Sequence, residues 1–221
     1  VDCDWSSDVC SSDLLEDEPA IEWRNYSRST DGLRAGDGTH PDAPDSARLQ
    51  AWCEGRTGYP MVDACMRQLR ATGLLNFRMR AMLVSFAAYH LGLHWREPGL
   101  FLARQFLDFE PGIHWSQMQM QSGTTGINTV RIYSPVKQAL DQDPAGAFIK
   151  RYVPELAAVP VAYLAQPHTM PAALQQHIGV RIGHDYPAPV VDHVTAYRAA
   201  RERIAAVRSE EHTSELQSQS T

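Results

Sequence analysis

The most sharply defined chemical group in this 221-residue sequence is an arginine on an apolar helical face. The residues four, seven and eleven positions after Arg80 are all apolar, so a helix places Arg80 among them. An unpaired charge on such a face costs several kcal/mol, and this cost requires an acidic partner. Asp108 and Glu110, at the end of the next helical segment, are the candidates. Arg80 is therefore either one half of a structural salt bridge or a ligand-binding group.

Histidines provide a second set of candidates. His90 and His94 have the i, i+4 spacing of a metal-chelating pair, but no third ligand is near them in the sequence. We interpret them as residues at a helix C-terminus, where the helix dipole favours a positive charge. His114 stands beside Trp115 in a polar, aromatic-rich stretch and is the better functional candidate, with a packed or capping histidine as the alternative.

Two further patterns are better explained by ordinary structure than by a binding site. Gly123-Thr124-Thr125-Gly126 partly resembles a phosphate-binding loop, but it lacks the lysine and the strand–loop–helix context. Trp52, Trp95 and Trp115 are, taken alone, typical of core anchors.

The elements that must position these groups are predicted to be helices, because apolar residues recur at helical spacing and no strand pair competes. Residues 109–135 lack that spacing and are predicted to be a ligand-facing loop. The fold class is therefore all-α. The predicted helices are 61–71 (opened by Pro60 and ended by Gly73), 74–91, Pro98–Leu107, about 143–152, 170–178 and 190–208.

Both ends of the chain have an unusual composition that distorts its overall charge. Residues 1–14 and 209–221 show no helical or strand periodicity and resemble translated sequencing adapters, so we interpret them as non-native tails around a domain at 15–208. The tails carry seven acidic residues and no Lys or Arg, so the formal net charge changes from −6 for the whole chain to +1 for residues 15–208. The basic side is 18 Arg and two Lys, which permits phosphate ligands.

The cysteines and the hydropathy indicate the compartment. Cys53 and Cys65 are the two outside the tails, and we interpret them as packing residues in a reducing environment. No run of 18 uncharged apolar residues is present, and neither end resembles a signal peptide. We therefore expect a cytoplasmic protein with no membrane partner and no metal.

An ordered series of motifs resembles the C-terminal, all-helical FAD domain of the photolyase/cryptochrome family. The resemblance covers roughly residues 49–208 without a break in order. Its segments are Trp52–Leu69 (WCEGRTGYPMVDACMRQL), Thr72-Gly73, Arg78-Met79-Arg80, His94–Pro98 (HWREP), Arg131–Pro135 (RIYSP), Phe148–Leu156 (FIKRYVPEL) and Tyr186–Val191 (YPAPVV).

The resemblance implies FAD as the cofactor and assigns residues to it. Arg80 and Asp108 match the family's buried Arg–Asp pair beside the flavin ring, where a fixed guanidinium stabilises the reduced, anionic flavin. Glu110 matches a second acidic residue that contacts the cofactor. His114 falls about where the family has Asn or Asp beside flavin N5, and would alter proton supply to that atom. Phe77 stands where repair enzymes of the family typically have Asn.

The resemblance also implies positions for electron transfer and DNA binding. Trp95 matches the middle member of the family's tryptophan chain. Met118 and Met120 stand where the family's repair enzymes have a Trp-x-Trp motif. The first Trp of that motif donates electrons to the flavin beside it. The second stacks on the damaged bases that are flipped out of the DNA duplex. With Met118 there, photoreduction through Trp95 needs another intermediary, for which Trp115 is the nearest candidate. Arg78 and Gln138 match positions near the DNA backbone.

Three functions follow from the resemblance. The first is a FAD-dependent photolyase that repairs pyrimidine dimers in DNA by electron transfer from reduced flavin. The second is a cryptochrome-like blue-light photoreceptor without repair, which Phe77 and the Met118/Met120 pair favour slightly. The third is an inert fragment that cannot hold FAD, because the family's antenna domain and first FAD-domain helices have no match here. The antenna chromophore is accordingly unknown.

Overall fold

The computed structural model describes residues 44–123 and 131–218, and within these ranges the chain is helical. This confirms the all-α fold class. The one β-bridge among these residues is isolated and joins Ile182 to Tyr186. The predicted boundary at residues 14/15 and most of the Gly123–Gly126 motif lie outside the described residues. The elements are α3 (Pro44–Glu54), α4 (Pro60–Thr72), α5 (Phe77–Ser85), the π-helical turn η2 (Phe86–His90), α6 (Arg96–Ala103), α7 (Pro111–Ser122), α8 (Pro135–Gln142), α9 (Ala147–Tyr152), the 3₁₀ turn η3 (Pro154–Leu156), α10 (Val161–Leu164), the 3₁₀ turn η4 (Pro167–Thr169), α11 (Ala172–Ile178) and α12 (His193–Ser218).

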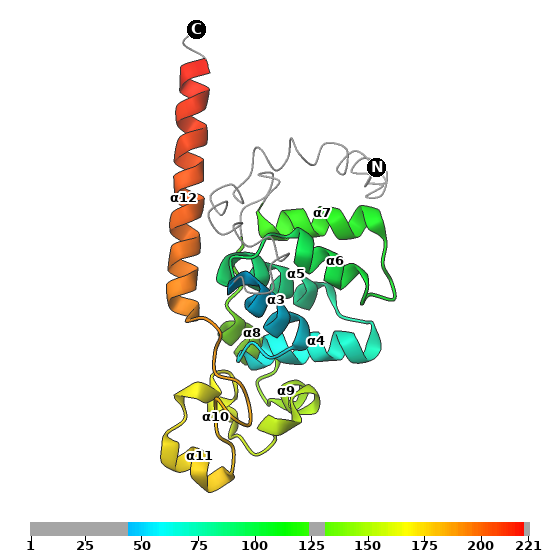
Figure 1. The fold of residues 1–221 in the computed structure, drawn as a ribbon, viewed down its shortest axis with the longest axis vertical. Coiled ribbons are helices and arrows are strands. Elements are labelled where there is room, and N and C mark those ends of the chain that lie inside the picture. Colours follow the sequence, from blue (N-terminus) through cyan, green and yellow to red (C-terminus); the bar gives the residue numbers. More distant parts are fainter. Residues whose placement is uncertain (1–43, 124–130, 219–221) are drawn as a thin grey trace.

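Helix α4 is the centre of the packing. It contacts α3, α5, α8 and α9, while α7 packs against both α5 and α6. Helix α12 runs along one side of the body, contacts it mainly through η2, and projects beyond it (Figure 1). None of the helices in the described ranges is both long enough and apolar enough to cross a membrane.

Local sequence explains α4 and α5. The predicted helix 61–71 is confirmed, whereas the predicted helix 74–91 begins later, at Phe77, and consists of α5 followed by the π-helical turn η2. Pro60 occupies the first turn of α4, and Gly73 ends it in the left-handed conformation with its N–H bonded to the carbonyl of Leu69. Asn76 caps α5 by accepting a hydrogen bond from the N–H of Met79. The apolar residues that recur at helical spacing within 74–91 are all buried: Leu75, Met79, Met82, Leu83 and Phe86.

The prediction of a loop over residues 109–135 was wrong. Residues 111–122 form α7, which Pro111 opens and Gly123 closes in the left-handed conformation. Both signals were in the sequence, but the alternation of Gln and Met hid the helical spacing. Helix α8 was not predicted either, although Ser134 caps it and Pro135 opens it.

Helix boundaries differ at α6 and α12. Helix α6 starts two residues before Pro98, because a proline fits the first turn of a helix. It ends at Ala103 rather than Leu107, because the N–H of Leu107 bonds instead to the carbonyl of Gly73. Helix α12 begins at His193 and continues past the predicted boundary at residue 208 to Ser218, although those last residues show no helical periodicity.

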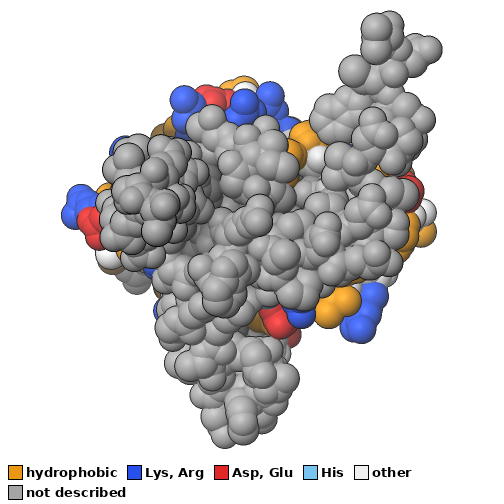
Figure 2. Space-filling view, turned by 90° about the horizontal axis from the view of Figure 1, so that it is seen from above, with side chains coloured by type: hydrophobic (Ala, Val, Ile, Leu, Met, Phe, Trp, Pro, Cys, Tyr) orange, Lys and Arg blue, Asp and Glu red, His pale blue; other side chains and the backbone are white. Residues whose placement is uncertain are grey.

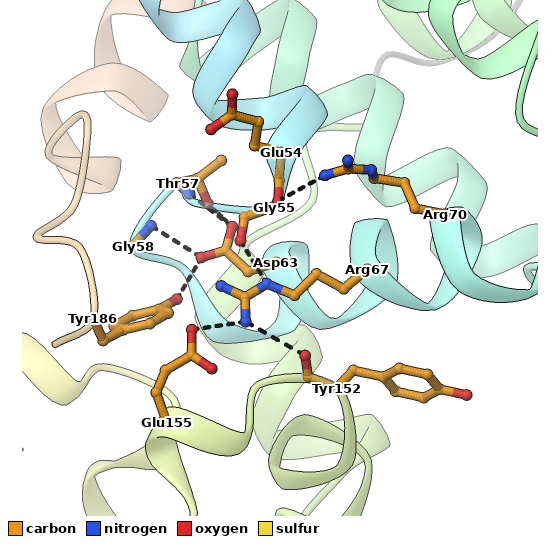
Figure 3. Close-up of polar contacts among 10 residues, drawn as sticks. All are labelled: Glu54, Gly55, Thr57, Gly58, Asp63, Arg67, Arg70, Tyr152, Glu155 and Tyr186. Carbon is orange, nitrogen blue, oxygen red and sulfur yellow. Dashed lines mark hydrogen bonds and ion pairs between the residues drawn. The ribbon is translucent and has the colours of Figure 1, made fainter.

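A buried carboxylate joins the start of α4 to the segment that precedes α12 (Figure 3). Asp63 has no exposed surface, and its oxygens accept hydrogen bonds from the N–H and hydroxyl of Thr57, the N–H of Gly58 and the hydroxyl of Tyr186. Burial raises the pKa of Asp63, and the hydrogen bonds from Thr57 and Tyr186 oppose that rise. We call these four residues the Asp63 junction.

Two neighbours of the Asp63 junction extend it. Gly58 has φ +79°, and a Cβ there would lie 2.5 Å from the backbone of Ala188, so only glycine fits. The hydroxyl of Tyr59 donates to the carbonyl of Val191 at 2.7 Å and accepts from the N–H of His193 at 3.0 Å. The loop before α4 therefore fixes where α12 begins.

Charges on the surface are mixed. Viewed from above, Lys and Arg side chains stand at several places along the outline, with Asp and Glu side chains near some of them (Figure 2). No single acidic patch appears among the described residues visible in that view.

Candidate functional site

Arg80 is held by three groups at the edge of a pocket. Its Nε donates to the carbonyl of Leu75 at 2.7 Å, and its Nη2 lies 2.6 Å from Oδ2 of Asp108. Its guanidinium carbon stands 4.1 Å from the centre of the Phe106 ring. The predicted pairing with Asp108 is therefore confirmed. The burial expected for this pair is not confirmed, because the side chains of Arg80 and Asp108 are 24% and 52% exposed.

The pocket brings together six of the residues that the sequence singled out. Its volume is about 130 Å³, and we call it the Arg80 pocket. Its walls come from α5, from the 106–110 segment and from α7, and they are rich in aromatic and aliphatic side chains. The predicted residues that line it are Phe77, Arg80, Asp108, Glu110, His114 and Met118. Sequence reasoning missed its other walls, which include Phe106, Phe109, Ile113 and Gln117.

Glu110 has a local structural task. Its carboxylate accepts a hydrogen bond from the N–H of Ile113 at 2.7 Å, which caps the N-terminus of α7. A negative charge is also favourable at that end of the helix dipole. Glu110 thereby fixes the helix that carries His114 and Met118 into the pocket.

His114 is buried and orientated by the backbone. Its Nε2 lies 2.9 Å from the carbonyl oxygen of Gly99, and a carbonyl can only accept, so Nε2 carries the proton. Burial is the main cause that lowers the pKa of His114, and the charge of Arg80 lowers it further. The neutral ring therefore presents Nδ1 as a hydrogen-bond acceptor.

Aromatic rings lead from the pocket wall into the core. The ring centre of Trp115 lies 4.8 Å from that of His114 and 6.3 Å from that of Trp95. Trp95 is almost fully buried. A Cβ on Gly99 would lie 3.1 Å from the Trp115 ring and 3.3 Å from Met118, so this glycine lets both side chains approach α6. Met118 is buried in the pocket wall.

A second cavity contains two of the three predicted DNA-binding residues. Its volume is about 670 Å³, and we call it the His90 basin. Arg78 and Gln138 line it together with Arg131 and Lys137, whereas Met120 lines neither cavity. Helix α12 closes one side with His193 and Tyr197. Arg131 belongs to a motif noted in the sequence, but no sequence signal placed α12 here.

His90 is not the charged helix-end residue that its position predicted. It is 4% exposed, stacks on Phe86 with ring centres 5.0 Å apart, and lies in a π-helical turn. Burial is the main cause that lowers its pKa to about 4, and the charge of His193 adds to the effect. The ring is therefore neutral at pH 7 and draws no stability from the helix dipole.

This protonation behaviour predicts a stability that depends on pH. The pKa of His90 is about 4 in the folded chain against an ordinary value of 6.5. Between these values the unfolded chain binds more protons, so the free energy of unfolding should fall as the pH is lowered from about 6.5 to about 4. The expected loss from His90 is on the order of 3 kcal/mol. Denaturant unfolding at pH 7, 6, 5 and 4 measures it.

A matched variant isolates the contribution of His90. His90→Phe keeps a planar ring in the same place without a titrating group, so its stability should change less over this range. His177→Phe, on the exposed side of α11, should retain the wild-type pH dependence. If the free energy of unfolding changed equally with pH in wild type and in His90→Phe, the assignment of this pH dependence to His90 would be contradicted.

Comparisons with known proteins agree on the fold. Residues 9–206 match the family model described as the FAD binding domain of DNA photolyase. The chain is 36% identical over 202 residues to a cryptochrome DASH of Gloeobacter violaceus, which covers 86% of this chain and 40% of the relative. It is 36% identical over 192 residues to a deoxyribodipyrimidine photo-lyase of Vibrio cholerae, covering 86% and 39%.

A solved structure gives the same result. The chain matches the crystal structure of a bacterial class III photolyase from Agrobacterium tumefaciens with a TM-score of 0.73 and 31% identity, covering 90% of this chain and 40% of that one. The chain thus spans about two fifths of the length of these relatives.

Proposed function

The chain belongs to the photolyase/cryptochrome family, within its FAD-binding domain, and on that premise we propose that the Arg80 pocket holds the flavin ring of FAD in a light-dependent DNA photolyase. The observation that carries this proposal is the Arg80–Asp108 pair, fixed at the edge of a pocket with aromatic walls and a neutral histidine. Bound, reduced FAD would supply the light-excited electron that splits a pyrimidine dimer.

The residues of the pocket fit a flavin ring. Phe77 and Ile113 are each 59% exposed at the pocket, so they offer apolar surface to a planar ring. Arg80 offers a positive charge whose orientation is already fixed, which favours negative charge on a ligand without reorganisation. Asp108 balances part of that charge. Nδ1 of His114 can accept a proton or a hydrogen bond from a ring N–H.

DNA binding is proposed for the His90 basin. Arg78, Arg131 and Lys137 line one cavity, and cationic side chains supply the salt-dependent part of binding to phosphodiesters. This arrangement supports the DNA contacts predicted for Arg78 and Gln138. Met120, at the position of the lesion-stacking Trp, remains a prediction that the two cavities do not support.

Two measurements test the proposed function. Blue-region flavin absorption of the purified chain tests cofactor binding, and its absence would support the inert-fragment alternative. With flavin bound, loss of pyrimidine dimers from irradiated DNA under blue light tests repair. Flavin without repair would support the photoreceptor alternative, which is favoured because Phe77 and Met118 at the pocket differ from the residues typical of the family's repair enzymes.

The electron route gives a separate prediction. We propose that electrons reach the pocket from Trp95 through Trp115, because these rings are adjacent and Trp115 also contacts His114. Trp115→Phe should slow photoreduction of bound flavin by about tenfold or more, equivalent to ~1.4 kcal/mol in the barrier. Transient absorption with an added thiol as final reductant measures the rate. Trp52→Phe, which replaces a buried tryptophan that packs against Phe101, is the matched control.

Photoreduction at the wild-type rate in Trp115→Phe, or equal slowing in Trp52→Phe, would contradict this route. Flavin content is measured in each variant, so that a lost cofactor is not mistaken for a slow electron transfer.

A further inference from the structure

The His90 basin contains polar groups that its cationic rim does not explain. Within the described part of the chain, neither ring nitrogen of His90 has a hydrogen-bond partner, and the same holds for Oε1 of Gln138. His90 is 4% and Gln138 8% exposed, and both line the basin. Buried polar atoms without partners cost free energy in a folded protein, so a partner from outside the described chain is implied.

These groups ask for more than a phosphate. A phosphodiester carries no proton at neutral pH, so it can only accept hydrogen bonds. Oε1 of Gln138 can also only accept, so its partner must be an N–H or O–H donor, which a phosphodiester lacks. A neutral imidazole requires one donor and one acceptor. A single ligand that served both these groups and the cations would combine an anionic part with a part that carries hydrogen-bond donors and acceptors.

The walls of the basin fit a planar group. Tyr133 and Tyr197 line it from two different elements, and aromatic side chains are the surfaces on which unpaired bases stack. The amide of a glutamine pairs with the amine and ring nitrogen at the edge of adenine. Arg78, Arg131 and Lys137 supply positive charge for a phosphate, and Asp141, which also lines the basin, offsets only one of these three charges.

The basin is separate from the Arg80 pocket. The two cavities share no lining residue, and Arg78 and Arg80 leave α5 toward different cavities. The carbonyl of Arg131 and the N–H of Tyr133 both bond to the hydroxyl of buried Ser85, at 3.2 and 3.1 Å, which fixes the 131–133 segment against α5.

We propose that the His90 basin binds one unpaired nucleotide, with its phosphate on the Arg78–Arg131–Lys137 rim and its base on His90 and Gln138. This inference rests on the proposed DNA binding and adds a subsite that reads a base, distinct from the pocket for flavin. An adenine nucleotide has the required amine donor and ring acceptor.

The test compares strands that differ only in their bases. The full chain is titrated with a fluorescently labelled deoxyadenylate hexamer and with an abasic hexamer that has the same phosphodiester backbone. The intact strand should bind about tenfold tighter in wild type. His90→Phe and Gln138→Leu should each remove most of this difference. His90→Phe should also retain binding to the abasic strand, which shows that the rim is still folded. Lys137→Ala should weaken both strands alike.

Two exposed residues on α11 provide the matched controls. Gln176→Leu and His177→Phe, both exposed on α11, should leave the tenfold difference unchanged. Equal binding of the intact and abasic strands by wild type would overturn the proposal, as would an unchanged difference in Gln138→Leu. If His90→Phe does not fold, Gln138→Leu decides the question alone.

Two further measurements distinguish a free nucleotide from a unit of DNA as the ligand, and distinguish failure of the base subsite from failure of the proposed DNA binding. Competition by free deoxyadenosine monophosphate would identify a free nucleotide as the ligand, and binding restricted to the strand would identify a unit of DNA. If neither hexamer binds, the proposed DNA binding fails together with the base subsite. If dimer repair persists while the two hexamers bind equally, only the base subsite fails.

Discussion

Asp63→Ala is expected to lower the free energy of unfolding by about 3 to 5 kcal/mol, the largest stability effect that the described structure predicts. The substitution removes the acceptor of four hydrogen bonds and leaves the donors of Thr57, Gly58 and Tyr186 buried. It also opens a space in a region without exposed surface. Urea unfolding followed by circular dichroism measures the change.

Graded variants keep this prediction specific. Asp63→Asn retains one carbonyl oxygen for Thr57 but turns an N–H₂ group toward two other donors, so its loss should be smaller than that of the alanine variant. Glu202→Ala, an exposed carboxylate on α12, should change stability by less than about 0.5 kcal/mol. A loss below about 1 kcal/mol for Asp63→Ala would show that the Asp63 junction is not a stabilising centre.

Arg80→Leu is expected to weaken FAD binding by about 30- to 150-fold, equivalent to 2–3 kcal/mol for a lost charge-assisted contact. The guanidinium is already fixed by Leu75, Asp108 and Phe106, so its interaction with a ligand requires little ordering. The variant also leaves the Asp108 carboxylate at the pocket without a cation, where it repels a negatively charged flavin. Flavin fluorescence during titration of the chain with FAD measures the affinity.

The control for Arg80→Leu distinguishes a binding role from a structural one. Arg80→Lys keeps the charge but loses the planar guanidinium that bonds both Leu75 and Asp108, so it should recover part of the affinity. Arg151→Leu, exposed on α9, should bind FAD as wild type does. Unchanged FAD affinity in a folded Arg80→Leu protein would show that Arg80 serves only to hold α5 against the 106–108 segment.

Sequence patterns predicted what depends on neighbours along the chain. The helices α4 and α5 were predicted because their apolar residues recur every three to four positions, and Pro60 and Gly73 mark the ends of α4. The Arg80–Asp108 pair followed from the cost of an unpaired charge on an apolar face. Helix α7 was hidden because its buried positions hold His114, Gln119 and Ser122 as well as Met118.

Features that depend on distant packing were not predictable in this way. His90 has the sequence of a helix-end histidine, and only the packing of Phe86 and α12 around it makes it neutral. Asp63 is a single acid in an apolar helix, and its partner Tyr186 is 123 residues away. The resemblance to a family supplied six of the residues that line the Arg80 pocket, but not its other walls or the α12 wall of the His90 basin.

Helix α12 contributes to only one of the two cavities. The Arg80 pocket is enclosed by α5 and α7, which pack directly against each other. The α12 wall of the His90 basin is held by the Tyr59 hydroxyl at its start and by the small cluster of Ala88, Tyr89 and Ala200 farther along. Residues of α12 line the basin but not the Arg80 pocket, so a change in the position of α12 would alter the shape of the nucleotide subsite and leave the flavin pocket as it is.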